Sequence, residues 1–305
     1  MTGDPRIVSI IVTTRDRPSL VPHAVASALE QTYSPVEVIV VDDGSVEPYS
    51  DGSGDTRVEV VRLSPGRGVC AARNRGVEAA DGDWVVFLDD DDRLAPDMVE
   101  SSLAAAHASP LPRPVAVLSA IQRVDDARRP GKLLHPPTLP RGADHFLEEG
   151  VAGSFLTHNS LFVPTTVVRA IGGWDENLTT SEHDDFFLRL NAVCSLQGND
   201  TVGYYLASSS LPRLHQATLQ RAAAMEQTVR KHPAPFRRHR RRGAHYMATV
   251  GVTYLRGGCW GSALVWTSRA VARDPLRGRH LAWWLASLIG PVPLRWWRAL
   301  RNRRS

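Results

Sequence analysis

The chain has 305 residues, of which 43% are hydrophobic, so it can bury a sizeable core and is not disordered as a whole. Its three cysteines, Cys70, Cys194 and Cys259, stand far apart, which argues against a disulfide framework or a cysteine zinc site. The net charge of +4 hides two unlike parts: residues 221–305 hold 18 Lys and Arg against two acids (+16), and residues 1–220 hold 18 against 30 acids (−12).

Short apolar runs rich in β-branched residues predict buried strands, and amphipathic runs between them predict helices. We expect strands at residues 7–12, 36–41, 57–61, 84–88, 115–120 and 160–164. We expect helices at residues 18–31, 68–80, 96–107 and 182–194, and a surface loop at residues 125–145. Because strand and helix alternate over short connections, the pattern predicts an α/β protein with a mostly parallel, doubly wound sheet.

Two acidic clusters follow predicted strands, Asp42-Asp43 after the second and Asp89 to Asp92 after the fourth. Ligands of doubly wound sheets bind beyond the carboxyl ends of the strands, so both clusters lie where a site is expected. Four adjacent carboxylates repel one another unless a cation or hydrogen bonds hold them, and oxygen ligands suit Mg²⁺ or Mn²⁺. The plainer interpretation is a solvated turn, with Asp92 capping the next helix.

The order of these pieces resembles the family 2 glycosyltransferases of the GT-A fold. The similar segments lie at residues 8–14, 27–33, 38–45, 72–76, 82–92 and 172–176, and the resemblance covers roughly residues 7–215. It implies a GT-A catalytic domain at residues 1–218, with a nucleotide-binding, doubly wound mixed sheet. A basic, Trp-rich helical tail follows at residues 219–305.

The resemblance implies roles for residues at the ends of three strands. Asp43 would contact the base of the nucleotide, and Thr13 would line the base pocket. Asp91 takes the metal-ligand position, Asp90 would contact the ribose or the sugar, and Asp89 completes the D-x-D spacing. The implied cofactor is a divalent metal, Mn²⁺ or Mg²⁺.

Arginines and one histidine are further candidates on the donor side. Arg15 stands where the family often has an aromatic residue, and it would stack on the base or reach the phosphates. Arg67 and Arg73 are candidates to face the donor, although each could be an ordinary surface arginine. Arg213 and His215 resemble an Arg-x-His that closes over the diphosphate. His215 would then contact the metal or phosphate, and the alternative for both is a simple connector.

The helix predicted from residue 182 carries the candidates for proton transfer. The family usually has Glu-Asp here, with the aspartate as general base, and the aligned pair in this chain is Glu182-His183. A neutral imidazole accepts a proton near pH 7, so His183 is preferred over its neighbour Asp184. Asp184 also fits a capping-box-like helix start with Ser181. Glu182 would bind the acceptor or orient the base.

After about residue 217 the pattern becomes helical, with a dense cationic run at residues 237–242 and a helical hairpin at residues 248–272. Four tryptophans lie beside arginines, at positions Trp283, Trp284, Trp296 and Trp297. This composition favours attachment to an anionic membrane surface, against the alternative that the tryptophans pack within the protein. Nucleic acid is not expected as a partner, because no recognised motif accompanies the charge.

We therefore predict a metal-dependent, inverting glycosyltransferase that uses a nucleotide-sugar donor, UDP-linked, and a carbohydrate, lipid-linked or small-molecule acceptor. The opening residues lack the pattern of a secretion signal, so we expect a cytoplasmic protein, membrane-associated at the inner face. One alternative is a catalytically altered sugar-nucleotide-binding protein, and another is a nucleotidyltransferase. A GxGxxA spacing at residues 66–71 formally allows a dinucleotide-binding oxidoreductase, although it follows the third strand and not the first.

Overall fold

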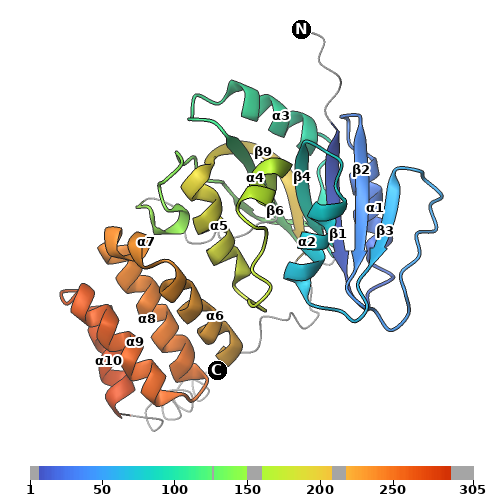
Figure 1. Cartoon of the computed structure of the whole chain (residues 1–305). Coiled ribbons are helices and arrows are strands. Elements are labelled where there is room, and N and C mark those ends of the chain that lie inside the picture. The colour runs from blue at the N-terminus through green and yellow to red at the C-terminus, as the bar shows by residue number, and fades with distance from the viewer. Residues whose placement is uncertain (1–6, 126, 150–159, 208–217, 290–305) are drawn as a thin grey trace. The chain divides into compact units, whose positions relative to one another are not determined.

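The computed structural model describes residues 7–125, 127–149, 160–207 and 218–289. The chain divides into two compact units (Figure 1). The sheet unit comprises Met1–Phe146, Gly150–Leu178 and Asp185–Leu211. The helical unit comprises Leu147–Glu149, Thr179–Asp184 and Pro212–Ser305, so it takes two short pieces from the middle of the sequence.

A mixed sheet of nine strands, counted over the described residues, forms the centre of the sheet unit, in the order β3-β2-β1-β4-β8-β6-β9-β5 with β7 paired to β6. Strands β3, β2, β1 and β4 run parallel, whereas β8 is antiparallel to β4 and β6. The α/β, doubly wound mixed sheet expected from the sequence is therefore confirmed. The strands are β1 Val8–Thr14, β2 Val36–Asp42, β3 Val58–Arg62, β4 Trp84–Asp89, β5 Arg93–Leu94, β6 Val115–Val124, β7 Pro130–Leu134, β8 Leu161–Pro164 and β9 Ser195–Ala207.

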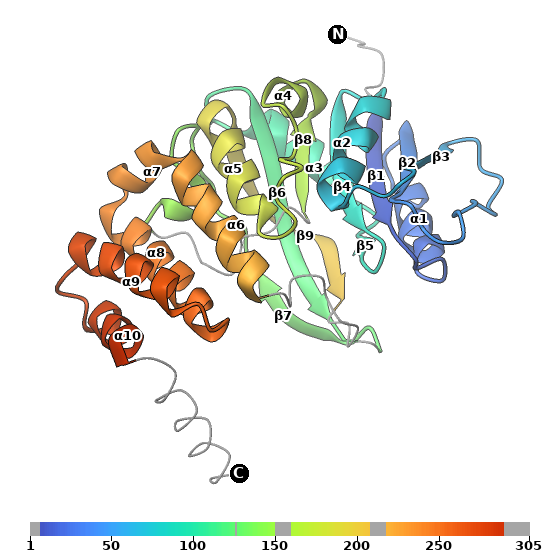
Figure 2. The same cartoon turned by 60° about the horizontal axis from the view of Figure 1, so that its bottom comes forward.

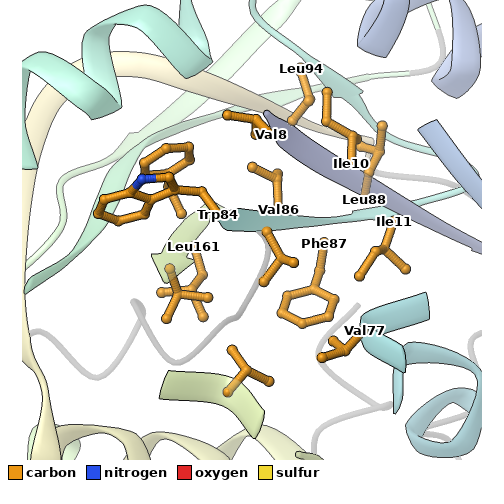
Figure 3. Packing of buried hydrophobic residues seen from close by; sticks show 14 of the residues in the cluster. Val8, Ile10, Ile11, Val77, Trp84, Val86, Phe87, Leu88, Leu94 and Leu161 are labelled. Carbon is orange, nitrogen blue, oxygen red and sulfur yellow. The ribbon is translucent and has the colours of Figure 1, made fainter. Parts of the chain in front are cut away.

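Helices cover both faces of this sheet. They are α1 Val21–Leu29, α2 Val69–Ala79, α3 Met98–Ala108, α4 Thr165–Ala170 and α5 Glu182–Val193, with a 3-10 helix η1 at His145–Leu147. Figure 3 shows Ile11 and Phe87 on the face covered by α2, and Ile10 and Leu94 on the opposite face, where α1 packs. Because β1, β2 and β4 are buried from both sides, their sequences are apolar nearly throughout, as parallel strands require.

The helical unit contains α6 Thr218–Lys231, α7 Pro233–Arg238, α8 Arg240–Arg256, α9 Trp260–Arg273 and α10 Gly278–Ile289. Helix α8 packs against α6, α9 and α10 (Figures 1 and 2). The Glu226 carboxylate of α6 links them, because it accepts hydrogen bonds from Tyr254 of α8 at 2.8 Å and from Trp266 of α9 at 3.0 Å. Among the described helices, none combines the length and the apolar character needed to cross a membrane.

Several elements differ from the sequence expectation. The 13-residue strand β9 was not predicted, because glycine, asparagine and aspartate interrupt its apolar pattern. Its pairing with β6 shifts register around Ala120, so the strand continues past these polar residues. Strand β7 lies inside the expected loop at residues 125–145, and the short elements β5 and α4 were also missed.

Candidate active site at the carboxyl ends of β1, β2 and β4

The register of three parallel strands brings both acidic clusters to one edge of the sheet. These are Asp42-Asp43 and the acidic run, Asp89 to Asp92. Thr14 at the end of β1 pairs with Asp42 at the end of β2, and Thr13 pairs with Asp89 at the end of β4. Both acidic segments therefore begin at the same edge, where doubly wound folds bind ligands.

Asp43 is buried and receives backbone hydrogen bonds from the loop that follows β3. Its Oδ1 accepts from the Arg67 amide at 2.6 Å, and its Oδ2 accepts from the Gly68 amide at 2.9 Å. The loop can come this close only because of glycines: a Cβ on Gly66 would lie 2.1 Å from the Asp43 carbonyl oxygen, and Gly44 has a φ of +73°. Two amides of the GxGxxA segment therefore donate hydrogen bonds to a carboxylate of the protein itself, that of Asp43.

Arg15 and Arg67 flank Asp43 and are both exposed. The Arg15 Nη1 atom lies 3.8 Å from the Asp43 Oδ2 atom, while the Arg67 guanidinium forms an ion pair with Glu176 at 2.5 Å. Arg15 therefore lies beside the predicted base-contacting carboxylate, and the Arg67 side chain extends towards the Gly-Gly-Trp-Asp-Glu segment at residues 172–176.

Asp42 stabilises the turn after β2. It accepts hydrogen bonds from the amides of Ser45 at 2.8 Å and Tyr49 at 3.1 Å, and Arg62 lies 3.2 Å away. Burial alone would raise the pKa of the Asp42 carboxyl, but these hydrogen bonds and the charge of Arg62 hold it below its ordinary value. Asp42 therefore has a structural role that positions Asp43.

Asp90 and Asp91 share a cationic partner that the sequence interpretation missed. Arg17 Nη1 lies 3.0 Å from Asp90 Oδ1 and 3.4 Å from Asp91 Oδ2. Asp90 also accepts a hydrogen bond from Thr14 Oγ1 at 2.8 Å. Burial raises the pKa of Asp90 to about 6, although the Thr14 hydrogen bond and the Arg17 charge oppose this shift.

Asp92 does not cap helix α3, whose N-cap residue is Asp97, so that expectation was wrong. Its carboxylate accepts hydrogen bonds from the Tyr204 hydroxyl and from the Ala207 amide, both at 2.8 Å. The Tyr204 hydroxyl in turn accepts a hydrogen bond from the Asp89 amide at 3.3 Å. The unpredicted strand β9 thereby anchors the end of the acidic run.

Arg73 is nearly fully buried beneath the acidic run. Its Nη2 atom lies 3.2 Å from Asp89 Oδ1, and its guanidinium lies over the Trp174 ring, 4.7 Å from the centroid. Trp174 stacks on Phe186 at a centroid distance of 3.9 Å. The arginine predicted to face the donor therefore contacts a D-x-D carboxylate from inside the protein.

The four aspartates of the run are not equivalent. Burial, followed by the charges of Asp89 and Asp91, raises the pKa of Asp92 well above its usual range, and the pKa of Asp90 is raised as well. In contrast, the Asp89 and Asp91 side chains remain 32% and 16% exposed. Charge that a ligand can reach is therefore concentrated on Asp89 and Asp91.

A second polar run begins helix α5, at Glu182, His183, Asp184 and Asp185. Asp185 is fully buried, and the Arg189 Nε and Nη2 atoms donate to its Oδ2 at 2.9 and 2.7 Å. Arg189 also donates to the carbonyl oxygens of residues 171 and 173, so this pair fixes α5 against the glycine turn at residues 172–173.

Asp184 is also buried, whereas the His183 side chain keeps 28% of its surface exposed. The Tyr246 hydroxyl of α8 donates to Asp184 Oδ2 at 2.5 Å, and His183 Nε2 lies 3.7 Å from Asp184 Oδ1. Burial raises the pKa of Asp184, against the opposing effects of His183 and Tyr246. Glu182 is buried to 9% exposure.

Arg213, His215, Trp296 and Trp297 lie outside the described residues. The predicted roles of Arg213 and His215 at the donor, and of the last two tryptophans at a membrane, therefore stay predictions.

The profile of the family described as "Glycosyl transferase family 2" matches residues 9–162. Similar curated proteins include an uncharacterized glycosyltransferase of Haemophilus influenzae, 38% identical over 105 residues that make up 34% of this chain and 36% of that one. The succinoglycan biosynthesis protein ExoO of Rhizobium meliloti is 35% identical over 105 residues, 33% of this chain and 30% of that one. The aligned regions thus span about a third of these curated relatives.

Solved structures extend the likeness in fold over nearly the whole chain. Staphylococcus aureus TarS in complex with UDP superimposes with a TM-score of 0.64 at 16% identity, covering 92% of this chain and 88% of that chain. Its complex with UDP-GlcNAc gives a TM-score of 0.56 at 17% identity, covering 92% and 79%. The profile spans half of the sequence and includes both acidic segments at the sheet edge. This chain belongs to glycosyltransferase family 2.

Proposed function

We propose that the protein transfers a sugar from a UDP-linked donor to an acceptor hydroxyl by a single displacement with inversion. The observation that carries this proposal is the pair of accessible carboxylates, Asp89 and Asp91, at the sheet edge that also holds Asp43. TarS, which shares the fold, is described in complex with UDP and with UDP-GlcNAc, and this supports a uridine nucleotide as the donor's leaving group.

The residues at this edge fit a divalent cation. The described part of the chain has no group of three or more His, Cys, Asp or Glu side chains that could hold a metal ion. Mg²⁺ sites, however, often use one or two carboxylates and take further oxygens from substrate phosphates. Asp91, supported by Asp89, would hold the ion. When bound, it would neutralise charge on the departing diphosphate.

For proton transfer, burial favours His183 over Asp184. A group that removes a proton from an acceptor hydroxyl must come within hydrogen-bonding reach of it. Asp184 is enclosed and its Oδ2 atom is engaged by Tyr246, whereas part of the His183 imidazole is exposed. We therefore assign the proton-accepting role to His183, and we place Glu182 beside it at the acceptor side.

Calorimetry with UDP, in the presence and absence of Mn²⁺, tests the nucleotide and metal assignments together. We expect UDP to bind more tightly with Mn²⁺, and ADP to bind more weakly than UDP under both conditions. UDP-sugars are then screened for release of UDP, with and without candidate acceptors. Equal binding of UDP and ADP would refute the uridine assignment.

The same screen separates the alternative functions. UDP binding without UDP release from any donor or acceptor pair would favour a catalytically altered sugar-nucleotide-binding protein. Release of pyrophosphate from a nucleoside triphosphate would favour a nucleotidyltransferase. Release of UDP together with a glycosylated product is the result that the proposed function requires.

Two features of the helical unit support attachment to an anionic membrane. Helix α10 exposes an apolar stripe at helical spacing, formed by Leu281, Leu285, Leu288 and Ile289. Trp284 instead donates to Ser268 Oγ at 2.9 Å, so at least this tryptophan takes part in packing within the unit.

Arginines are crowded in the same unit. Burial lowers the pKa of Arg273, and the nearby charges of Arg237, Arg240 and Arg269 lower it further. An apolar stripe together with clustered cations suits the boundary between anionic headgroups and acyl chains. We therefore propose that the protein attaches peripherally to an anionic bilayer, where a lipid-linked acceptor would be available.

Sedimentation with vesicles tests this attachment. We expect binding to vesicles that contain phosphatidylglycerol and little binding to phosphatidylcholine alone. Replacing Leu281, Leu285 and Leu288 together with serine should abolish it, whereas Val46→Ser, an exposed apolar residue of the sheet unit, should not. Unchanged binding of the triple variant would argue against α10 as the membrane surface.

A further inference from the structure

The segment that holds the predicted proton acceptor belongs to the helical unit. Residues Thr179–Asp184 group with the helices after residue 212, whereas α5 from Asp185 onward groups with the sheet. The change occurs within one helical turn, just after Ser181, which has a φ of +55°. The surroundings of His183 and Asp184 are therefore set in part by residues more than 30 positions further along the chain.

Tyr246 of α8 contacts this segment directly. It is 8% exposed, packs beside Phe236 at a ring-centroid distance of 5.2 Å, and donates its hydroxyl hydrogen to Asp184 Oδ2. A buried hydroxyl is costly unless it is hydrogen-bonded, so the pairing satisfies both groups. Burial, and next the charge of Asp184, raise the pKa of Tyr246 well above its usual range, so the tyrosine keeps its proton and remains a donor.

The two oxygens of Asp184 have different neighbours. Oδ2 is engaged by Tyr246, while Oδ1 lies 3.7 Å from His183 Nε2. Two further charged groups act on Asp184 among the described residues: Glu182, whose charge raises its pKa, and Arg221 of α6, whose charge lowers it. Because the tyrosine fixes one oxygen, the negative charge of the second acts on one nitrogen of the imidazole across this 3.7 Å contact.

We propose that Tyr246 is a positioning residue for transfer, acting through Asp184 on the imidazole of His183. This inference rests on the proposed function, in which His183 accepts the proton. Asp184 faces Nε2, so it favours the tautomer that carries its proton there, and Nδ1 is left as the nitrogen that accepts the acceptor's proton. The helices after residue 218 thus contribute to proton transfer as well as to packing.

The chain offers a matched control for this role. Tyr254 lies on the same helix and donates its hydroxyl to the Glu226 carboxylate at 2.8 Å, so it is also a tyrosine–carboxylate pair. Both Tyr246→Phe and Tyr254→Phe remove one such hydrogen bond from α8. A general loss of stability should affect both variants, whereas a positioning role should affect only the first.

The first readout is the rate of UDP release as a function of pH. We expect Tyr246→Phe to lower kcat roughly tenfold, in line with losses seen when residues that orient functional groups are removed. The KM for the donor and the Kd for UDP should stay within about twofold, since the change acts on the proton and not on the nucleotide. Loss of the Tyr246 hydrogen bond makes Asp184 easier to protonate, which weakens its support of charged His183. The pH profile of kcat should therefore shift.

The second readout does not need turnover. In the full chain labelled with ¹⁵N-histidine, the His183 signals, assigned with a His183→Gln sample, report the tautomer of the imidazole. We expect the Nε2-protonated tautomer in the natural chain, and a loss of this preference in Tyr246→Phe and in Asp184→Asn. Tyr254→Phe should leave the His183 signals unchanged.

The outcomes separate this inference from the proposed function. If the natural chain releases no UDP from any donor, the function fails, while a shifted His183 signal in Tyr246→Phe still supports the coupling. If the natural chain is active and Tyr246→Phe matches it in kcat and pH profile, the inference is overturned. Equal loss of activity in Tyr254→Phe would likewise overturn the inference, because Tyr246 would then act only through packing and stability.

Discussion

The chain contains two polar runs, Asp89 to Asp92 after β4 and Glu182 to Asp185 at the start of α5, and each is anchored by a tyrosine hydroxyl. In the first run Tyr204 holds the last aspartate, Asp92, and two carboxylates stay accessible. In the second run Tyr246 holds Asp184, and a histidine stays accessible instead. Burial and partners thus decide which side chains a ligand can reach, and the type of the accessible side chain decides whether the run suits a cation or a proton.

The largest effect is expected from breaking the cation side of this comparison. Asp91→Asn keeps the size of the side chain but removes the charge proposed to hold the metal, and it should lower kcat by about 10³-fold or more. Asp92→Asn, in the same run, should keep its activation by Mn²⁺ because Asp92 is committed to Tyr204 and Ala207. Steady-state assays across a Mn²⁺ titration distinguish the two variants, and full activity in Asp91→Asn would overturn the metal assignment.

A change in the second run, which is proposed to accept the proton, should lower turnover without weakening nucleotide binding. We expect His183→Ala to lower kcat by about 10²-fold, within the usual range for a general base, while the Kd for UDP measured by calorimetry stays within about twofold. A variant with near-normal turnover would move the proton-accepting role to Asp184 or to another group.

Loss of the tyrosine hydroxyl that anchors the first run, that of Tyr204, should mainly lower the stability of the fold. Tyr204→Phe leaves the buried Asp92 carboxyl with one fewer donor and removes the acceptor for the Asp89 amide. We expect the free energy of unfolding in urea to fall by about 2 kcal/mol. A loss under about 0.5 kcal/mol would show that β9 is held to the acidic run by other contacts.

Asp42, a buried carboxylate outside both runs, shows the opposite pKa shift to Asp90 and Asp92. The pKa of Asp42 is held below its ordinary value, so its charge stabilises the fold above the unfolded-state pKa, and that contribution is lost as pH falls through the folded-state pKa. Asp42→Asn should lower the free energy of unfolding at pH 7 by about 1 kcal/mol, and the deficit should narrow below about pH 4. Urea unfolding at both pH values tests this, and a deficit that widens in acid would contradict it.

Local sequence patterns were sufficient to predict the strands that place Asp43 and Asp89 to Asp91, because buried parallel strands are apolar throughout and end abruptly at acidic turns. The anchors were not predictable in the same way. Tyr204 lies 112 residues from Asp92, and Tyr246 lies 62 residues from Asp184. Neither spacing leaves a local pattern, and Tyr204 lies on a strand that polar residues conceal. Arg17 was missed because nothing near the first strand indicates a partner 73 residues away.

The assignment of Thr179–Asp184 to the helical unit also bears on how such proteins can be recombined. A chimera joined once, after residue 218, would combine the Asp184 of one parent with the α8 of another. Unless the second parent supplies a hydroxyl at the position of Tyr246, that graft would fold with a mismatched carboxylate beside the histidine. Exchange of the helices between relatives therefore calls for two crossovers, or for a tyrosine transplanted with them.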